Sequence, residues 1–422
     1  MKPLLLTVLL LAAGAHADDL LQTWDKARAA DPLLRQAAAH SGAAEAEARV
    51  ARAALLPQWT LSHDETRTSG GARQHDSTSR LSQPLIDLAA LRAWDAGRSS
   101  ASAEAERLAA ATQAARARVA QAYFGLLTAQ ARLATARANE DAFDRQVHEA
   151  ETRFAAGLSA QVEADQSRAY RELARAGTLA AEAALADARE ALAQLTGEMP
   201  TTVQPLRAGF AAVALPDGAD AWSERALAGN PALRALRLDV QASEQRLGAA
   251  RAGHWPTLAL GVETSRQRGG GVPPLDAART PTQLALRLTL PLFAGGATTA
   301  AADRAGFQRE AAREQLEAGR RALLREVRAE LLAIGQGAAQ LRSTQAAVDA
   351  AERALAATRT GLTLGTRSTT DLLLAIQTLA GAQNAQTQAR HGHVLALLAL
   401  HQAAGSLGDA EIAAVNALLE QP

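Results

Sequence analysis

The sequence predicts a mainly α-helical protein with a small β part, arranged as a tandem structural repeat. Three observations lead to this prediction. Two uninterrupted helical patterns, over 88–155 and 295–362, are each 68 residues long. Each is preceded by two short stretches in which apolar and polar residues alternate as they do in strands. The order of these patterns in the first half of the chain recurs in the second half.

The composition favours extended helical bundles over a thick globular core. Only 3% of the 422 residues are aromatic, and alanine dominates long tracts. Helices that pack through alanine approach each other closely. The 44 basic and 44 acidic residues give a formal net charge of zero, so the charge gives no reason to expect nucleic acid as a partner. The absence of cysteine excludes disulfides, thiolate metal sites and a lipid-modified N-terminal cysteine.

The N-terminus predicts a secretory signal peptide over 1–17. Lys2 precedes an apolar run over 4–13, and Ala15-His-Ala17 is a small-residue cleavage site. This run is too short to span a bilayer, and no later run reaches about 18 apolar residues. We therefore expect an exported chain without a transmembrane helix, whose contact with a membrane would have to use strands.

Internal similarity indicates a duplication. Asp31-Pro recurs as Asn230-Pro at an offset of 199 positions. In the long helices and beyond them the offset is 208, which relates Gly157 to Gly365 and Gly197 to Gly405. The offset changes where the two hairpin loops differ in length, as expected for two copies of one unit.

Each repeat is expected to contain a helix, two strands, a long helix and a returning helix. For repeat 1, over 18–219, we expect a helix over 19–55, strands over 58–68 and 77–86, the long helix over 88–155, a helix over 159–196 and an equatorial segment over 198–219. For repeat 2, over 220–405, we expect a helix over 220–254, strands over 257–266 and 282–293, the long helix over 295–362 and a helix over 366–405; a C-terminal equatorial segment covers 406–422. Helices 159–196 and 220–254 together nearly match one long helix in length, so we expect them end to end beside it.

Prolines mark the expected boundaries between strands and helices, at Pro57, Pro84, Pro256 and Pro291. The clearest strand pattern covers 282–293, where leucines alternate with Ala, Arg and Thr over a length that suits a tilted transmembrane strand. The pattern over 58–68 is weaker because polar residues interrupt it. A soluble hairpin is the alternative reading of these strands.

The long helices carry a seven-residue apolar repeat, which is typical of a coiled-coil seam. In the second repeat its members are Val327, Ile334, Leu341, Val348, Leu355 and Leu362. A helix of 68 residues is about 100 Å long. It ends in a short glycine-centred turn, at Gly157 in repeat 1 and at Gly365 in repeat 2, so each turn folds two rods against each other.

Four strands cannot close a barrel, and an open strand edge inside a bilayer leaves backbone groups unpaired at several kcal/mol each. Copies of the chain must therefore combine their strands. Two copies give eight strands, whose interior is filled by side chains, whereas three copies give twelve and leave room for a water-filled lumen. A trimer is the smallest assembly that makes a channel.

The chain resembles the TolC-like outer-membrane efflux protein family over essentially all of its mature length. The resembling segments are Asp31-Pro, Leu56-Pro57, Gly253-His-Trp-Pro-Thr-Leu258, Leu290-Pro-Leu-Phe-Ala-Gly-Gly296, Gly365-Thr-Arg-Ser-Thr-Thr-Asp371 and Ala403-Ala-Gly-Ser-Leu407. The resemblance implies a homotrimer with a twelve-stranded β-barrel in outer-membrane lipid, continued by a long periplasmic α-helical barrel. It also implies two protein partners, a periplasmic adaptor (membrane-fusion) protein and an inner-membrane transporter of RND or ABC type. The implied function is an exit duct for small-molecule efflux or type I protein secretion.

The resemblance also implies a gate at the periplasmic tip, where polar contacts hold the inward-bent hairpins. The corresponding positions are Arg367 on one hairpin and Val162 and Glu163 on the other, with Asp371 at the constriction. Solvated charges in a turn are the alternative reading of these residues. Members with the tightest latch carry an aromatic residue at the position of Leu362. One member has a second acidic residue at the position of Leu374, so the expected acidic ring is single here.

No motif predicts catalysis, a cofactor or a metal site. His391 and His393 are two positions apart, so they point to different faces of a helix and suit packing better than chelation. Gly269-Gly-Gly271 lacks the Lys-Ser/Thr of a phosphate-binding loop. The alternatives to a channel are a soluble periplasmic coiled-coil scaffold and, with least support, an enzyme on a helical frame.

Overall fold

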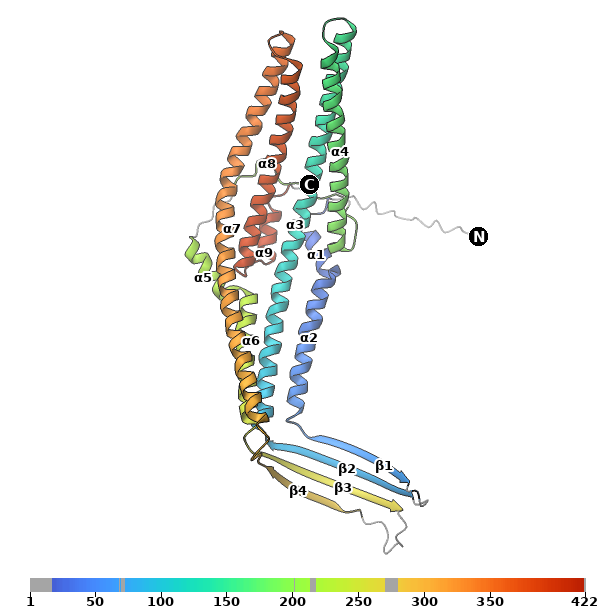
Figure 1. Cartoon of the computed structure of the whole chain (residues 1–422), viewed down its shortest axis with the longest axis vertical. Helices are drawn as coiled ribbons and strands as arrows, with labels where there is room; N and C mark the ends of the chain where they lie inside the picture. Colours follow the sequence, from blue (N-terminus) through green and yellow to red (C-terminus); the bar gives the residue numbers. More distant parts are fainter. Residues whose placement is uncertain are drawn as a thin grey trace, which may run out of the picture. The chain divides into compact units, whose positions relative to one another are not determined.

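The computed structural model describes residues 17–67, 69, 73–200, 202–212, 218–269 and 280–420. The signal peptide expected over 1–17 lies outside these ranges except for Ala17. Most residues of the two loops that join the expected strands within each repeat, near 70 and near 275, also lie outside them. The described elements are helices α1 (Leu20–Ala30), α2 (Pro32–Ala53), α3 (Leu88–Ala155), α4 (Gln161–Thr196), α5 (Ala219–Gly229), α6 (Pro231–Ala252), α7 (Ala297–Thr363), α8 (Thr369–Ala403) and α9 (Asp409–Asn416), and strands β1 (Gln58–Arg67), β2 (Arg73–Ile86), β3 (Thr257–Gly269) and β4 (Thr282–Thr289) (Figure 1).

The chain forms two compact units, and each unit draws segments from both repeats. Unit 1 comprises Met1–Leu34, Ala111–Asn230 and Leu323–Pro422, and unit 2 comprises Arg35–Ala110 and Pro231–Ala322. The long helices α3 and α7 contribute residues to both. Unit 1 contains both glycine-centred turns, and unit 2 contains the whole sheet.

The helices expected over 19–55 and 220–254 are each broken into two. Asp31 and Asn230 adopt extended backbone conformations (φ −60°, ψ 114° and φ −65°, ψ 119°) and end α1 and α5. A proline follows each of them, and a proline disfavours helical geometry in the residue before it while suiting the first position of the next helix. The Asp31 carboxylate then accepts the Leu33 N–H (2.8 Å) at the start of α2.

The four strands form one antiparallel sheet in the order β1-β2-β3-β4, so the central β2–β3 pair joins the two repeats. Its two faces differ. Leu81 pairs with Val262 and Leu258 pairs with Leu288, which places apolar side chains on the same face. Arg80 and Glu263 pair on the other face and form an ion pair (2.7 Å).

Two prolines lie differently from the expected strand boundaries. Pro84 is inside β2, where the register with β3 shifts between Pro84 and Ile86. Such a bulge accommodates the missing proline N–H within a central strand. Pro291 follows the end of β4 at Thr289, so the strand expected over 282–293 is shorter. Pro57 and Pro256 directly precede β1 and β3.

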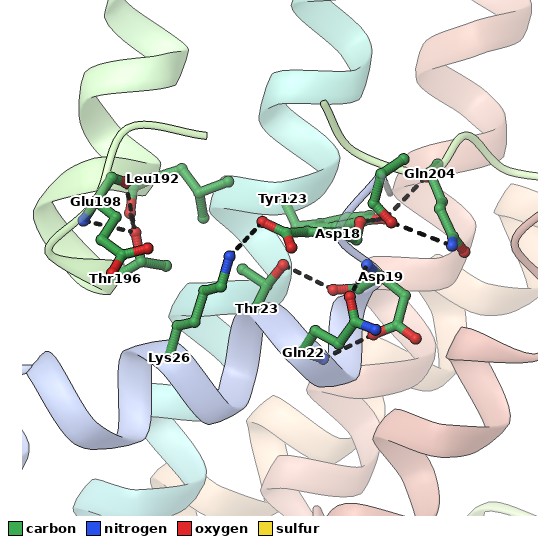
Figure 2. Close-up of polar contacts among 11 residues, drawn as sticks. Asp18, Asp19, Gln22, Thr23, Lys26, Tyr123, Leu192, Thr196, Glu198 and Gln204 are labelled. Atoms are coloured by element: carbon green, nitrogen blue, oxygen red, sulfur yellow. Dashed lines mark hydrogen bonds and ion pairs between the residues drawn. The ribbon is translucent and has the colours of Figure 1, made fainter. Parts of the chain in front are cut away.

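The core of unit 1 is built around fully buried aromatic side chains of α1 and α3, including Trp24, Tyr123 and Phe124. The Tyr123 hydroxyl lies within hydrogen-bonding distance of the carbonyls of Asp18 (3.1 Å) and Gln204 (2.9 Å), as Figure 2 shows. Burial raises the pKa of this phenol. Tyr123 thus ties the equatorial segment, through Gln204, to Asp18 just before α1.

The equatorial segment also pairs with the C-terminal segment. Asp18 bridges Val203 in parallel, and Leu206 bridges Leu419 in antiparallel fashion. The Glu420 N–H donates to the Pro205 carbonyl (2.9 Å). The two ends of the described chain therefore meet the same segment of unit 1.

Histidine packing in unit 1 agrees with a structural role. His391 is buried, contacts the Phe124 ring (5.5 Å between centroids), and has its Nδ1 2.7 Å from the Thr128 hydroxyl. Among the residues that the structure describes, no group of three or more His, Asp or Glu side chains is placed to hold a metal ion. None of the described helices has the sustained apolar run needed to cross a membrane.

Acidification is expected to destabilise unit 1 through His391. Burial, with a smaller contribution from Arg390, lowers the pKa of His391 to about 4, whereas an unfolded histidine titrates near 6.5. Between these values the unfolded chain binds the extra proton, so the unfolding free energy falls by about 2–3 kcal/mol from pH 7.5 to 4.5. Denaturant titrations at both pH values should show this loss in the wild type and a smaller one in His391→Gln. An equal loss in both proteins would show that His391 is not the cause of the loss of stability at low pH.

Candidate functional site

The candidate site consists of the two glycine-centred turns in unit 1, which Figure 1 shows at the same end of the unit. Gly157 and Gly365 adopt left-handed backbone conformations (φ +72° and +73°). The Leu158 N–H donates to Arg153 (2.8 Å) and the Thr366 N–H to Gly361 (2.8 Å), which is the hydrogen-bond pattern of a glycine-terminated helix. The duplicated glycines therefore end α3 and α7 in the same way.

The structure has two helical hairpins, one formed by α3 and α4 and the other by α7 and α8. Hydroxyl groups at the start of α8 link these two hairpins. The Thr369 hydroxyl donates to Glu163 Oε2 (3.1 Å) on α4, and the Thr370 hydroxyl donates to Gln166 Oε1 (3.1 Å) one turn further along. Thr369 is buried, and Glu163 is half-buried. Glu163, one of the predicted gate residues, is thus held within its own chain by a neutral donor.

An apolar cluster lies beneath these polar links. It contains Phe143 of α3, Ala174 of α4, Leu355 and Leu362 of α7, and Leu372, Leu373 and Ile376 of α8. Leu362 is buried in this cluster, whereas Phe154, its counterpart in repeat 1, is 44% exposed. The two hairpins are therefore not equivalent, since the second one packs its apolar seam against the first.

Arg367 is exposed and forms no ion pair with Glu163 within the described part of the chain. Its backbone N–H donates to the Gly361 carbonyl (3.1 Å). Its side chain lies over Gly361, where an added Cβ would be 2.6 Å from Arg367 Cγ. Gly361 therefore positions Arg367, and the guanidinium group remains available to another molecule.

Asp371 takes part in capping the N-terminus of α8. Its carboxylate accepts the Ser368 N–H (3.0 Å), and its own N–H donates to the Ser368 hydroxyl (3.1 Å), which completes a capping box. Hydrogen bonding of the carboxylate by the Ser368 backbone N–H and side chain, aided by nearby Arg367, lowers the pKa of Asp371. The carboxylate is thus kept ionised at the tip. Val162 and Leu374 are 60% and 48% exposed.

Several residues of this site could not be found from the sequence. The hydroxyls of Thr369 and Thr370, the Gln166 amide and the close approach of Arg367 to Gly361 all involve ordinary surface residue types. The only sequence signal near them was the run of four hydroxyl-bearing or acidic residues from Ser368 to Asp371. That run predicts a helix start but gives no indication of a partner helix.

Comparisons with known proteins agree with the fold. The sequence matches the profile of the family described as outer membrane efflux protein over residues 23–198 and 222–406. It is 31% identical to outer membrane protein TolC of Vibrio cholerae serotype O1 over 97% of this chain and 96% of that protein. It is 29% identical to the alkaline protease secretion protein AprF of Pseudomonas aeruginosa over 97% and 89% of the two chains.

The fold itself is that of known outer-membrane channels. The chain superposes on the Campylobacter jejuni CmeC outer membrane channel with a TM-score of 0.82 and 19% identity, over 95% of this chain and 90% of that one. The structural likeness and the sequence matches both extend across the two repeats. The chain therefore belongs to the outer membrane efflux protein family.

Proposed function

We propose that this outer-membrane exit duct, which serves efflux or type I secretion, is a homotrimer in which three four-stranded sheets combine into a twelve-stranded barrel. The sheet supports this proposal. Among the described strands, β1 and β4 are each paired on one side only, while one face of the sheet carries the apolar side chains of Leu81, Val262 and Leu288 and the other carries the Arg80–Glu263 ion pair. Such a sheet suits lipid on one side and a water-filled lumen on the other, provided that neighbouring chains pair with its edges.

The helical part then extends into the periplasm, where we propose that the turns at Gly157 and Gly365 meet a periplasmic adaptor and an inner-membrane transporter of RND or ABC type. The exposed apolar side chains Leu158, Val162 and Leu364 at the turns (71%, 60% and 72% exposed) support a partner there. In this assembly the transporter selects the cargo. The chain itself acts as a conduit and not as an enzyme.

The oligomeric state is tested on full-length protein purified in detergent. Light scattering corrected for bound detergent should give three chains per particle, and the particles should conduct ions in a planar bilayer. A stable single-copy species that stays soluble without detergent would overturn the proposal.

The gate follows from the position of Arg367. We propose that Arg367 pairs with Glu163 of a neighbouring hairpin in the closed trimer, because Thr369 occupies only Oε2 of that carboxylate within the described chain. An exposed pair of this kind is worth about 0.2–1 kcal/mol, so three symmetric copies supply about 1–3 kcal/mol. A latch of this strength is weak enough for partner binding to open it.

Arg367→Ser is expected to raise the closed-state conductance in planar bilayers at least twofold. Gly361→Ala should have a similar effect, because its Cβ displaces the Arg367 side chain. Arg359→Ser removes an exposed arginine in the last part of α7, before the turn that carries Arg367, and serves as the control, with unchanged conductance. If Arg367→Ser also conducts like the wild type, Arg367 has no role in closing the channel.

A further inference from the structure

A basic cavity lies in unit 2, at the level where the strands join the helices. It has a volume of about 590 Å³. Leu88, the first residue of α3, and Trp255, two residues before β3, are among its lining residues. Figure 1 shows α3, α6 and α7 converging on the sheet at this end of the unit. The cavity size is typical of small-ligand sites.

Three arginines from three different helices line the cavity, namely Arg92 of α3, Arg251 of α6 and Arg309 of α7. The one carboxylate that also lines it, Glu244, is already paired with Arg313 (2.7 Å). The lining therefore carries an excess of positive charge, although the chain as a whole is neutral.

The hydrogen-bonding capacity of these arginines is largely unused. The Arg251 side chain is exposed, and it forms no hydrogen bond or ion pair with the described residues. Among the residues that the structure describes, the buried Nε of Arg309 has no hydrogen-bond partner, and the guanidinium group forms one loose ion pair, with Glu310 (3.6 Å). Arg92 donates to the neutral Gln245 side chain (3.0 Å). A buried donor without a partner is costly, so the site gains if a ligand supplies acceptor oxygens.

We propose that this cavity binds the phosphate group of a phospholipid from the periplasmic leaflet of the outer membrane. Guanidinium groups bind phosphate through paired hydrogen bonds, and basic pockets beside membrane-spanning segments bind lipid head groups. Trp255 is 59% exposed beside the start of β3, and tryptophan favours the head-group level of a bilayer. The indole then contacts the glycerol and upper acyl region while the arginines hold the phosphate.

The test uses the full-length protein, freed of lipid in detergent, with phosphatidylglycerol as the probe and native mass spectrometry as the readout. Arg251→Gln and Arg309→Gln are each expected to weaken binding about tenfold, as the loss of one charge-assisted hydrogen-bond pair predicts. Arg304→Gln is the matched control, because Arg304 is exposed on α7, closer along the chain to β4, and does not line the cavity. It should change binding less than twofold.

Two further arms identify the ligand. Diacylglycerol with the same acyl chains lacks the phosphate and should not bind measurably; equal binding of both lipids would overturn the proposal, as would unchanged affinity in both cavity variants. Full competition by millimolar inorganic phosphate would show a phosphate site filled by the free ion and overturn the lipid assignment.

The lipid site depends on the proposed membrane position of the sheet. Two further measurements distinguish a failure of the lipid site from a failure of the proposed channel function. On the same preparations, circular dichroism should show that the Arg251→Gln and Arg309→Gln variants are folded, and planar-bilayer recordings should show that they conduct. Lipid binding is then the one property that these variants have lost. A variant that neither folds nor conducts is replaced by Arg251→Lys, which keeps the charge but loses the paired hydrogen bonds and should bind lipid with intermediate affinity.

Discussion

Gly405→Ala is expected to destabilise the protein by about 2–5 kcal/mol, although it adds a single methyl group. Gly405 follows the end of α8 in a left-handed conformation (φ +75°), which alone makes alanine unfavourable by about 1–2 kcal/mol. An added Cβ would also clash with the Gly229 carbonyl oxygen and lie 2.8 Å from Asn230 Cα. Both neighbours are backbone atoms at the break between α5 and α6, so neither can rotate away, and overpacking adds about 1–3 kcal/mol.

Gly365→Ala is the matched control for this variant. Gly365 has nearly the same backbone conformation (φ +73°), but nothing lies within 4 Å of its added Cβ. Only the left-handed strain remains, so we expect a loss of about 1–2 kcal/mol. Urea titrations of the purified proteins, followed by helical circular dichroism, give both values. Equal losses in the two variants would show that the contact between Gly405 and Gly229 does not limit stability.

The repeat made most of the fold predictable from the sequence. Its offset of 208 relates Gly197 to Gly405, and the structure gives both a left-handed conformation at the end of a helix. The sequence could not predict how closely each approaches its partner. An added Cβ at Gly197 would meet the Ala30 side chain at 3.3 Å, whereas Gly405 meets the backbone of Gly229. This difference depends on which residues pack against each glycine. A glycine that marks the end of a helix in the sequence carries no information about that packing.

The candidate site was less predictable than the fold. Glycine-centred turns are local features, so Gly157 and Gly365 could be found from the sequence alone. The partners of the charged residues are distant in sequence, such as Thr369 for Glu163, 206 positions away. Polar side chains of ordinary type carry no periodic signal. Which of them meet is decided by the apolar cluster around Leu362 and Leu373, which brings the two hairpins together.

The helix break at Asp31 shows the same limit, and it leads to the second large expected effect. Duplication places Asp31 and Asn230 at equivalent positions before a proline, and both end a helix. Their partners differ. Asn230 donates its amide to the Ala403 carbonyl (3.0 Å), a neutral hydrogen bond. Asp31 instead pairs with Arg118 of α3 (2.7 Å), and its side chain is only 3% exposed.

Asp31→Ala is therefore expected to lower the unfolding free energy by about 2–4 kcal/mol. The substitution removes the cap of α2 and leaves Arg118 without its carboxylate, while Arg118 Nε is already buried without a partner. Only the Asp31 side of this ion pair is fully buried, since the Arg118 side chain is 36% exposed, so the unpaired guanidinium is partly solvated and its effect lies below that of a fully buried pair. Asn230→Ala removes a neutral side chain and leaves no unpaired charge behind, so it should lower the unfolding free energy by less, about 1 kcal/mol.

Adding Arg118→Met to Asp31→Ala separates the buried charge from the helix cap. The second substitution removes the unpaired guanidinium and keeps an apolar stem of similar length, so the double variant should regain about 1–3 kcal/mol over Asp31→Ala. The remaining deficit then measures the cap, which is worth about 1 kcal/mol. Urea titrations of the wild type, Asp31→Ala, Arg118→Met and the double variant provide the measurement. If the double variant is no more stable than Asp31→Ala, the buried charge is not the cause of the loss, and the cap together with local packing at the Asp31 break accounts for all of it.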